Sequence, residues 1–531
     1  MMQRRLVINS LLDLNPRLAR YGVDTFLQRC LMQDRVELVF GLVGPIGCPI
    51  HEASEILASC LKKLDYTPVT VTLSAEMDRL LDAKKSPRDQ DSDTSLLMAK
   101  IKKGNAVREA FGNNAVLASE AVRQIIDFRR SFAENAGEQD EEKLDQQAIV
   151  PLDEHAFIID QLKRPEEIEL LVKVFGKRFV QVSVVTPLEQ RRRSLVSRLG
   201  SEQHGWENVK CREEADKLIE VDQNEKLDDR GQRISKIFHL GDVFFDGSSE
   251  KSLEDSSERF IKAFFGRNNI APTIDEFGSY LAKAASLRSV DLSRQVGAAI
   301  LNDAGDLISV GCNEVPKSGG GNYWDNDTNK LRDIDLGGEP NKQQVNRMIF
   351  DFIEVLGKQG LLVEGAQVDN ILSDSKHKKA IKESLVSNVT EYSRAVHAEM
   401  NALSDAVRLG RSVAGSTIYV TTYPCHNCAK HLIASGIARI VFIEPYPKSK
   451  TESLFESIIA PDAGDLPLVS IEHFFGISPR RYRDIFEKEA RQTKEGEVED
   501  WYGGRKAPRI GQVEVGDSLR DLFAVLENLY S

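Results

Sequence analysis

Two short segments in the second half of the chain carry the side chains with the most evident chemistry. They are His397-Ala398-Glu399 and Pro424-Cys425-His426-Asn427-Cys428. One imidazole and two thiolates can hold a metal in a tetrahedral shell whose fourth position stays open to water, as in catalytic zinc sites. The sequence therefore predicts Zn²⁺ as cofactor, with His397, Cys425 and Cys428 as its ligands.

A carboxylate two residues after the histidine would carry protons at such a site. Zinc lowers the pKa of water to about 7, which makes a nucleophile at neutral pH. Glu399 is expected to take a proton from this water, pass it to a ring nitrogen and later protonate departing ammonia. H-x-E followed by P-C-x-x-C is the signature of zinc deaminases. A structural zinc knuckle or a redox pair is the alternative, but the sequence has no second C-x-x-C.

The residues around these segments predict the elements that position them. The pattern of apolar residues indicates a helix over 400–408, a strand over 417–422 and a second helix over 429–435. Cys425 would then stand between strand and helix, where the helix dipole favours a thiolate.

The stretch from about 277 to 480 resembles the deoxycytidylate (dCMP) deaminase family. Four segments carry the resemblance: 393–402 and 418–430 for the two zinc segments, 293–298 for the first strand and 311–316 for the sugar loop. The resemblance implies a three-layer α/β/α domain like that of cytidine deaminases. It also implies that Asn313 hydrogen-bonds the deoxyribose, that Tyr446 packs near the pyrimidine and that the backbone of Ala398 reads the cytosine carbonyl. Cys312 and Glu314 stand where the family has tyrosine and glycine.

Composition limits the classes of protein that fit. The 531 residues, 41% hydrophobic and 29% charged, are enough for two or three globular domains. A net charge of −12 argues against a surface that coats nucleic acid. Seven scattered cysteines indicate no disulfide framework, which predicts a cytoplasmic protein. No apolar run approaches the roughly 20 residues that cross a bilayer, so no membrane partner is expected.

The N-terminal half contains the order strand, glycine turn and helix. An apolar run over 36–43 predicts a buried strand, and a helix is expected over 51–64. Between them, Gly44, Gly47 and Cys48 are candidates for binding phosphate, as in a P-loop. The lysine and the hydroxyl of a full P-loop motif are missing after Gly47, which argues against kinase activity. A glycine turn without any ligand stays an alternative.

Later segments resemble the order of nucleoside-monophosphate kinases. A strand over 156–160 ends in Asp160, a second strand covers 179–185, and an arginine triplet that contains Arg192 opens the next helix. The resemblance implies that Asp160 and Arg192 lie near a nucleotide, although a solvated helix face would also explain the arginines. The alternation of strands and helices predicts a parallel sheet with helices on both faces.

These patterns predict the domain organisation. We expect a kinase-like domain with a degenerate P-loop over 1–268, a deaminase domain over 269–485 and a C-terminal tail over 486–531. The deaminase domain would contain an insertion over 317–391, with helices over 343–356 and 376–385. The charged segment 134–147 is expected to be a mobile loop.

A P-loop-like domain joined to a dCMP-type deaminase resembles the bacterial anti-phage deaminases. That resemblance implies conversion of free dCTP and dCMP to dUTP and dUMP with release of ammonia, which depletes the dCTP pool. It also implies a homo-oligomer such as a hexamer, a second regulatory nucleotide and a small inhibitory RNA as partners. Two alternatives stay open: a deaminase of cytosine or adenosine in RNA or DNA, and a bifunctional nucleotide-sensing or kinase–deaminase regulator.

Overall fold

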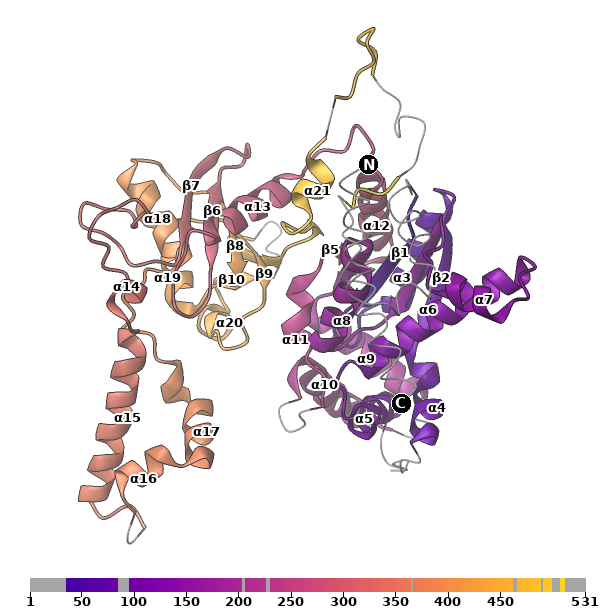
Figure 1. Cartoon of the computed structure of the whole chain (residues 1–531). Helices are drawn as coiled ribbons and strands as arrows, with labels where there is room; N and C mark the ends of the chain where they lie inside the picture. The colour runs from indigo at the N-terminus through magenta and orange to yellow at the C-terminus, as the bar shows by residue number, and fades with distance from the viewer. Residues whose placement is uncertain are drawn as a thin grey trace. The chain divides into compact units, whose positions relative to one another are not determined.

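The computed structural model describes residues 35–84, 95–202, 206–225, 230–363, 366–461, 466–488, 490–498 and 507–510. These residues form two compact units, each with its own six-stranded sheet. The first unit contains the described residues up to Pro272 and those from Phe475 onward, and the second runs from Thr273 to Phe474 (Figure 1).

The first unit alternates strands and helices along most of its length. Its elements are β1 (Leu38–Val43), α3 (Ile50–Lys62), β2 (Thr67–Thr72), α4 (Leu73–Ala83), α5 (Leu96–Ala110), α6 (Val116–Asn135), α7 (Glu141–Ala148), β3 (His155–Asp160), α8 (Pro165–Phe175), the 3₁₀ turn Gly176–Arg178, β4 (Phe179–Val185), α9 (Leu188–Glu202), α10 (Asn208–Asn224), α11 (Ile234–Ile237), the 3₁₀ turn Phe238–Leu240, β5 (Val243–Asp246), α12 (Glu250–Phe264), β12 (Gly476–Ile477) and α21 (Tyr482–Phe486).

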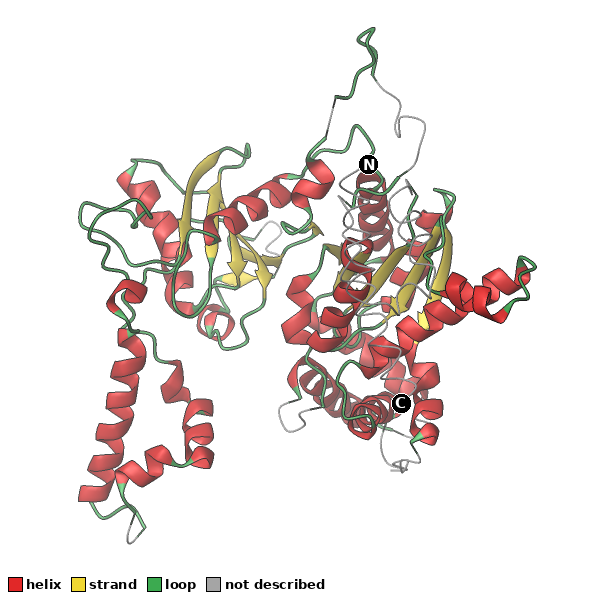
Figure 2. Cartoon of the chain, in the orientation of Figure 1, coloured by secondary structure: helices red, strands yellow, loops and turns green. Residues whose placement is uncertain are grey.

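The sheet of the first unit has the order β12-β5-β4-β1-β3-β2, and only β12 runs antiparallel to its neighbour. Phe40 of β1 packs edge-on against Phe264 of α12, with ring centroids 6.4 Å apart. Phe157 of β3, which pairs with the residue before Phe40, packs against Phe128 of α6 at 5.5 Å. Because successive strand residues project to opposite faces, helices cover both faces of the sheet (Figure 2). This confirms the predicted parallel architecture, whereas its kinase-like character stays a prediction.

The prediction of a mobile loop over 134–147 is wrong. The structure has the end of α6 there, a short turn and the start of α7. The carboxylate of Asp140 caps α7 by accepting hydrogen bonds from two backbone N–H groups of its first turn. Arg130 on α6 pairs with Glu141 and Asp145 of α7. The loop was predicted because the segment lacks periodic apolar residues. Charge pairs between α6 and α7 stabilise the helix in their place.

The second unit combines a mixed sheet with a helical insertion. Its elements are α13 (Ile274–Ser286), β6 (Gly297–Leu301), β7 (Leu307–Cys312), α14 (Asp333–Leu336), α15 (Pro340–Lys358), α16 (Val368–Ser373), α17 (Ser375–Glu383), the 3₁₀ turn Leu385–Asn388, α18 (Ala398–Arg408), β8 (Thr417–Thr422), α19 (His426–Ala434), β9 (Arg439–Glu444), α20 (Thr451–Phe455), β10 (Ile459–Ala460) and β11 (Val469–His473). The sheet order is β10-β11-β9-β8-β6-β7, in which β6 is antiparallel to both neighbours.

Two glycines let helices approach this sheet from opposite sides. A Cβ on Gly297 of β6 would lie 1.9 Å from the carbonyl oxygen of Ala282 in α13. A Cβ on Gly311 of β7 would lie 2.2 Å from the carbonyl oxygen of Ala398 in α18. Gly311 pairs with Ala298, the residue after Gly297, so the two helices lie on opposite faces. The second unit is therefore the three-layer α/β/α arrangement that the resemblance implied.

The insertion between β7 and α18 is mostly helical. The predicted helices over 343–356 and 376–385 correspond to α15 and α17, which begin and end within three residues of the expected positions. In Figure 1, α15, α16 and α17 extend away from the sheet of their own unit.

The boundaries between the units differ from those expected at 269 and 485. The second unit ends at Phe474, because the next residues return to the first sheet. There Ile477 of β12 pairs with Val243 of β5. Within the predicted tail over 486–531, Ile510 is buried in the core of the first unit. The greater part of that tail lies outside the described residues. In the part of the chain that the structure describes, no helix is long and apolar enough to cross a bilayer.

Candidate metal centre

The two segments that the sequence singled out converge in the second unit. Nδ1 of His397 lies 3.4 Å from Sγ of Cys425 and 3.4 Å from Sγ of Cys428. All three ligand atoms lie within 4.8 Å of one another. The structure thus brings together three groups that are 28 and 31 residues apart in sequence.

These distances fit a tetrahedral zinc ion. Zn–S bonds of about 2.3 Å and Zn–N bonds of about 2.05 Å at the tetrahedral angle place sulfur and nitrogen about 3.6 Å apart. The observed separation of 3.4 Å is close to that value. A three-ligand set leaves the fourth position for water.

His397 is held at the start of α18 by the extended segment that precedes it. It is the N-cap residue of this helix, with extended backbone angles. Val396 and Glu314 exchange two backbone hydrogen bonds, of 3.0 and 3.2 Å, which fasten this segment to the loop after β7. Asn401, one turn into α18, donates from Nδ2 to the carbonyl of Cys312 at 2.7 Å. Sequence reasoning missed Asn401, although it lies within the first zinc segment.

The two cysteines stand at the start of α19. Cys425 is the N-cap residue of this helix, and Cys428 is 1% exposed. The hydroxyls of Ser449 and Thr451 both donate to the carbonyl of Pro424 and hold the turn. Hydrogen bonds from Cys428 and from His397 lower the pKa of the Cys425 thiol to about 3. Cys425 is therefore a thiolate at neutral pH, the form that binds a metal.

Glu399 lies in the first turn of α18, beside the ligand cluster. Its side chain is 4% exposed. Burial raises the pKa of the Glu399 carboxyl, and the positive charge of His397 opposes that effect. A bound cation would act in the same direction as His397 and lower the pKa of Glu399. A buried carboxyl next to a metal position can accept and return a proton while it stays shielded from bulk water.

Asn313 is buried in the loop after β7, where its side chain holds the backbone. Its Oδ1 accepts a hydrogen bond from the N–H of Val296 at 2.7 Å, and its Nδ2 donates to the carbonyl of Arg294 at 2.8 Å. An amide nitrogen carries two hydrogens, so one donor remains for a ligand. The predicted contact of Asn313 with a deoxyribose is compatible with this arrangement and stays a prediction.

The other residues predicted to touch substrate lie around the same end of the sheet. Ala398 is the first residue of α18, so its N–H has no partner inside the helix and can face a carbonyl. Tyr446 is half-buried just beyond the end of β9. The guanidinium of Arg294 lies 5.4 Å from the ring centre of Tyr446, and its Nη1 pairs with Glu444 at 2.9 Å. Arg294 is a neighbour of the candidate site that sequence reasoning did not select.

The candidate residues of the first unit are only partly brought together. A cavity of about 870 Å³ is lined by Gly47, Cys48 and Asp160 among others. Burial raises the pKa of the Cys48 thiol to about 11 and that of the Asp160 carboxyl above its usual range. The Gly44 carbonyl accepts a hydrogen bond from Lys163.

Arg192 does not line this cavity and pairs instead with Glu189 and Asp216. The prediction that Arg192 contacts a nucleotide thus finds no support in its position. Its neighbour Arg191 is the member of the triplet that reaches the glycine turn, where Nη1 donates to the carbonyl of Ile46 at 3.4 Å.

Comparison with known proteins identifies the region that holds the metal cluster. Residues 273–444, all in the second unit, match the family model of the cytidine and deoxycytidylate deaminase zinc-binding region. The metal of this centre is zinc.

Curated relatives match over short stretches. A segment of 55 residues is 49% identical to deoxycytidylate deaminase of Enterobacteria phage T4, covering 10% of this chain and 28% of that protein. A segment of 64 residues is 41% identical to ComE operon protein 2 of Bacillus subtilis strain 168, covering 12% of this chain and 34% of that protein. The chain thus spans about a third or less of the length of these relatives.

A solved structure is similar over a longer stretch. It is the dCMP deaminase of cyanophage S-TIM5 in complex with dCMP and dUMP, and the similarity covers 39% of this chain and 100% of that chain. The identity is 16% and the TM-score is 0.23, values at which the likeness has no bearing on function.

Proposed function

We propose that the second unit hydrolyses the exocyclic amino group of a free deoxycytidine nucleotide, dCMP or dCTP, to give the deoxyuridine nucleotide and ammonia. The observation that carries the proposal is the cluster of His397, Cys425 and Cys428, with the buried carboxyl of Glu399 in the adjacent turn. The match of this region to the zinc-binding region of cytidine and deoxycytidylate deaminases supports it.

The side chains of the site divide the chemistry among them. Zinc, when bound, supplies a Lewis acid that lowers the pKa of water to about 7. Glu399 takes a proton from the attacking water and delivers it to N3 of the pyrimidine while the water oxygen adds to C4. Glu399 then takes the proton of the new C4 hydroxyl and passes it to the amino group. The C4–N bond breaks as the C4 carbonyl forms, and the amine departs as ammonia. Atoms balance as cytosine plus water giving uracil plus ammonia.

The remaining groups would orient the pyrimidine nucleotide. The N–H of Ala398, which has no partner within α18, would donate to the cytosine carbonyl. The remaining Nδ2 hydrogen of Asn313 suits the sugar hydroxyl, and the ring of Tyr446 gives the base an apolar surface. In the cell, such an enzyme would drain the dCTP pool, and we propose that this serves defence against phage. That role follows only from the resemblance of the two-unit organisation to anti-phage deaminases.

Product analysis of the purified protein tests the proposal. dCMP, dCTP, CMP and CTP are supplied separately, with and without a zinc chelator, and ammonia and uracil nucleotides are measured. We expect turnover of at least one deoxycytidine nucleotide that stops on chelation and resumes when zinc is added back.

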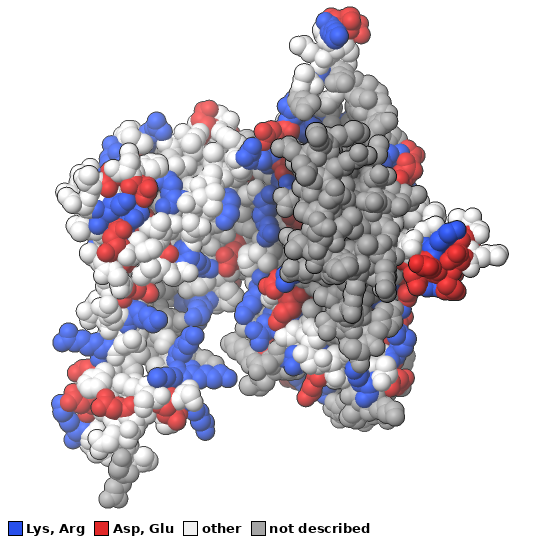
Figure 3. Space-filling view, viewed as in Figure 1, with Lys and Arg blue, Asp and Glu red and all other residues white. Residues whose placement is uncertain are grey.

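A polymer substrate is the competing assignment. In Figure 3, positive and negative side chains are interspersed over the visible face of the second unit. Channels that bind single-stranded nucleic acid are instead lined by one sign of charge and by stacked aromatic rings. Single-stranded DNA and tRNA are therefore included in the assay. Turnover of these polymers without turnover of free nucleotides would overturn the proposal.

A further inference from the structure

The glycine turn between β1 and α3 has few backbone donors left for a ligand. Its two prolines, Pro45 and Pro49, carry no N–H. The N–H of Cys48 donates to the carbonyl of Pro45 at 3.1 Å. The N–H of Ile46 donates to Oδ2 of Asp222 at 2.7 Å. Phosphate-binding loops offer such N–H groups to phosphate oxygens. In this protein the carboxylate of Asp222 accepts the hydrogen bond that a phosphate oxygen would accept.

Asp222 is itself part of a buried ion pair. It lies on the last turns of α10, 1% exposed, and its Oδ1 is 2.7 Å from Nζ of Lys163. The same ammonium donates to the carbonyl of Gly44 at 3.1 Å. A lysine from the loop after β3 therefore stands at the glycine turn, although position 48 has none. Sequence reasoning did not find Lys163 because it searched for the cation only after the last glycine.

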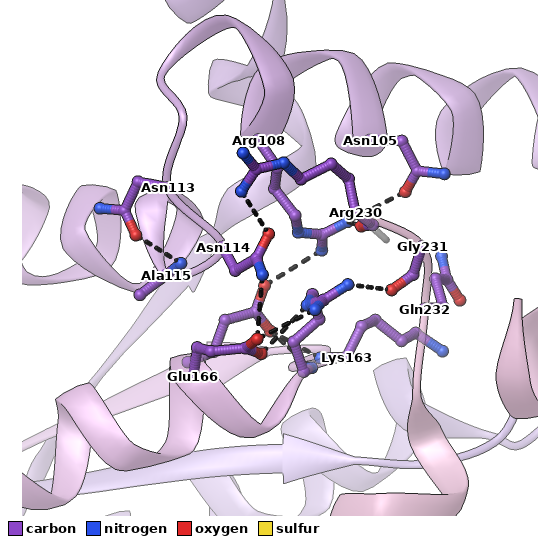
Figure 4. Close-up of polar contacts among 12 residues, drawn as sticks. Asn105, Arg108, Asn113, Asn114, Ala115, Lys163, Glu166, Arg230, Gly231 and Gln232 are labelled. Atoms are coloured by element: carbon purple, nitrogen blue, oxygen red, sulfur yellow. Dashed lines mark hydrogen bonds and ion pairs between the residues drawn. The ribbon is translucent and has the colours of Figure 1, made fainter. Parts of the chain in front are cut away.

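Lys163 is held firmly in this position by its own backbone. Its N–H donates to Oε2 of Glu167 at 2.7 Å, and its carbonyl accepts from the N–H of Arg233 at 3.1 Å. Figure 4 shows the surrounding network and the Lys163 side chain, which extends toward the side where Gln232 lies. A cation fixed in advance loses little conformational entropy when it meets an anion.

Both members of the pair line the cavity of about 870 Å³, which is large enough for a nucleotide. Gln232 lines the same cavity and is 8% exposed. Its Oε1 is buried and has no hydrogen-bond partner among the described residues. An unsatisfied buried acceptor is costly in a folded protein, so a donor from a ligand would relieve it.

We propose that Asp222 occupies the place of a phosphate on the glycine turn, and that the first unit accepts the phosphoryl group of a nucleotide there only when Asp222 withdraws. Two anions cannot share Lys163 and the N–H of Ile46, because their repulsion in a buried site is strong. Entry of the phosphoryl group would thus require the end of α10 to move. This inference concerns the first unit alone and does not depend on the proposed deaminase activity.

Pyrophosphate binding to full-length variants tests this directly by calorimetric titration. We expect little or no binding to the wild-type protein and an affinity at least about tenfold higher in Asp222→Ala, where Lys163 and Ile46 are released. The double variant Asp222→Ala with Lys163→Met should lose that gain. Asp216→Ala is the matched control, because Asp216 lies on the same helix but is exposed and pairs with Arg192.

A second substitution guards against misfolding. Asp222→Asn removes the charge and keeps the shape, so it should bind pyrophosphate more tightly than wild type even if Asp222→Ala folds poorly. The inference is overturned if the wild type binds pyrophosphate as tightly as the Asp222 variants. It is equally overturned if folded Asp222→Asn shows no gain, or if the gain persists without Lys163.

Discussion

His397 and Cys425 are both N-cap residues, His397 of α18 and Cys425 of α19. The positive ends of α18 and α19 therefore point at the metal cluster, where they favour thiolate and carboxylate over their protonated forms. Glu399 occupies the first turn of α18, where a negative charge is also favoured. The residue types and the helix starts act together, which explains why two short segments contain most of the site.

Replacement of Glu399 tests its role as the proton carrier. Glu399→Gln keeps the shape of the side chain but cannot accept a proton, so we expect kcat to fall by about 10²–10⁴-fold. Zinc content should stay near one ion per chain, because Glu399 is not one of the three ligands. Ammonia release and metal analysis on the same sample check both points. Glu456→Gln, at an exposed glutamate of the same unit, is the control. A fully active Glu399→Gln would remove this residue from its assigned role.

Replacement of Asn313 tests the proposed contact of the loop after β7 with the sugar. Asn313→Ala removes the hydrogen bonds to Val296 and Arg294, so the loop should lose its fixed conformation. We expect KM for the deoxycytidine nucleotide to rise by about tenfold, with a smaller change in kcat. The reason is that two hydrogen bonds, each of about 1 kcal/mol, no longer hold the loop in the conformation that binds the nucleotide. Steady-state kinetics measure both constants. Asn341→Ala, which removes an amide contact in the insertion, should leave KM unchanged. An unchanged KM in Asn313→Ala would contradict the prediction.

At the scale of elements, the site depends on how closely α18 lies on β7. The absence of a side chain at Gly311 permits this approach, because a Cβ there would lie 2.2 Å from the carbonyl oxygen of Ala398 and 2.4 Å from the backbone nitrogen of Ala402. Both atoms belong to the backbone of the helix and cannot rotate away. The position of His397 and Glu399 relative to the cysteines therefore follows from one glycine in a neighbouring strand.

Gly311→Ala should push α18 away from the sheet. We expect a loss of stability of about 1–3 kcal/mol from overpacking, together with weaker zinc retention and lower activity. Thermal melting and metal analysis after dialysis are the measurements. Gly200→Ala is the control, because a Cβ there meets no atom within 4 Å. Normal zinc retention in Gly311→Ala would show that the spacing between α18 and β7 is not critical.

The opposite helix layer is fastened by Asp275 of α13. Its carboxylate accepts hydrogen bonds from the hydroxyl of Tyr419 on β8 at 2.8 Å and from Arg439 on β9 at 2.7 and 2.9 Å. Burial alone would raise the pKa of Asp275. The hydrogen bonds from Arg439, the positive charge of Arg439 and the hydrogen bond from Tyr419 outweigh burial and lower this pKa overall. A lowered pKa means that folding favours the ionised form.

Asp275→Asn should destabilise the second unit at neutral pH. We expect a loss of about 1–2 kcal/mol, which allows for partial exposure of the pair. Because the pKa of Asp275 is lowered by folding, this stability is fully present above the unfolded pKa of about 3.9. It is lost as pH falls through the folded pKa. The difference in melting temperature between the two proteins should therefore be constant from pH 7 down to about pH 4 and shrink as the pH is lowered further. A difference that stays constant with pH would reject the charge-based explanation.

At the scale of the whole molecule, the three zinc ligands found among the described residues all lie in the second unit. The first unit has its own sheet and core, and Ile477, Ile485 and Ile510 return to that core from beyond the second unit. Metal binding should thus stabilise one unit and leave the other unchanged, since a ligand stabilises only the folded structure that binds it.

Hydrogen exchange with and without a zinc chelator tests this separation. On chelation, the amides of α18 and α19 should exchange at least about tenfold faster, because the three ligands stand at the starts of these helices. Peptides from α3 in the first unit serve as the internal reference and should not change. Added zinc should restore the protection. Equal loss of protection in both units would contradict a metal effect confined to the second.

Local patterns were sufficient for several features of this protein. The strands 179–185 and 417–422 have the predicted bounds, because continuous β-branched and apolar runs favour buried strands. The order helix, strand, helix over 400–435, the three zinc ligands and the candidate residue Glu399 also follow from residue type and spacing. The segment 134–147 was wrongly predicted as a loop, because α7 is stabilised by a cap and by charge pairs rather than by an apolar stripe.

By itself, the sequence determined the metal, its ligands and the parallel character of the first sheet, because ligand chemistry and the alternation of strands and helices can be read along the chain. Only the tertiary structure decided which distant groups meet. It placed Asn401 on the Cys312 carbonyl, returned residues 476–477 to the first sheet, and paired Asp222 with Lys163 at the glycine turn. These contacts join residues from 59 to more than 200 positions apart. No local pattern encodes them, since they arise only when packed helices and strands bring the side chains within hydrogen-bond distance.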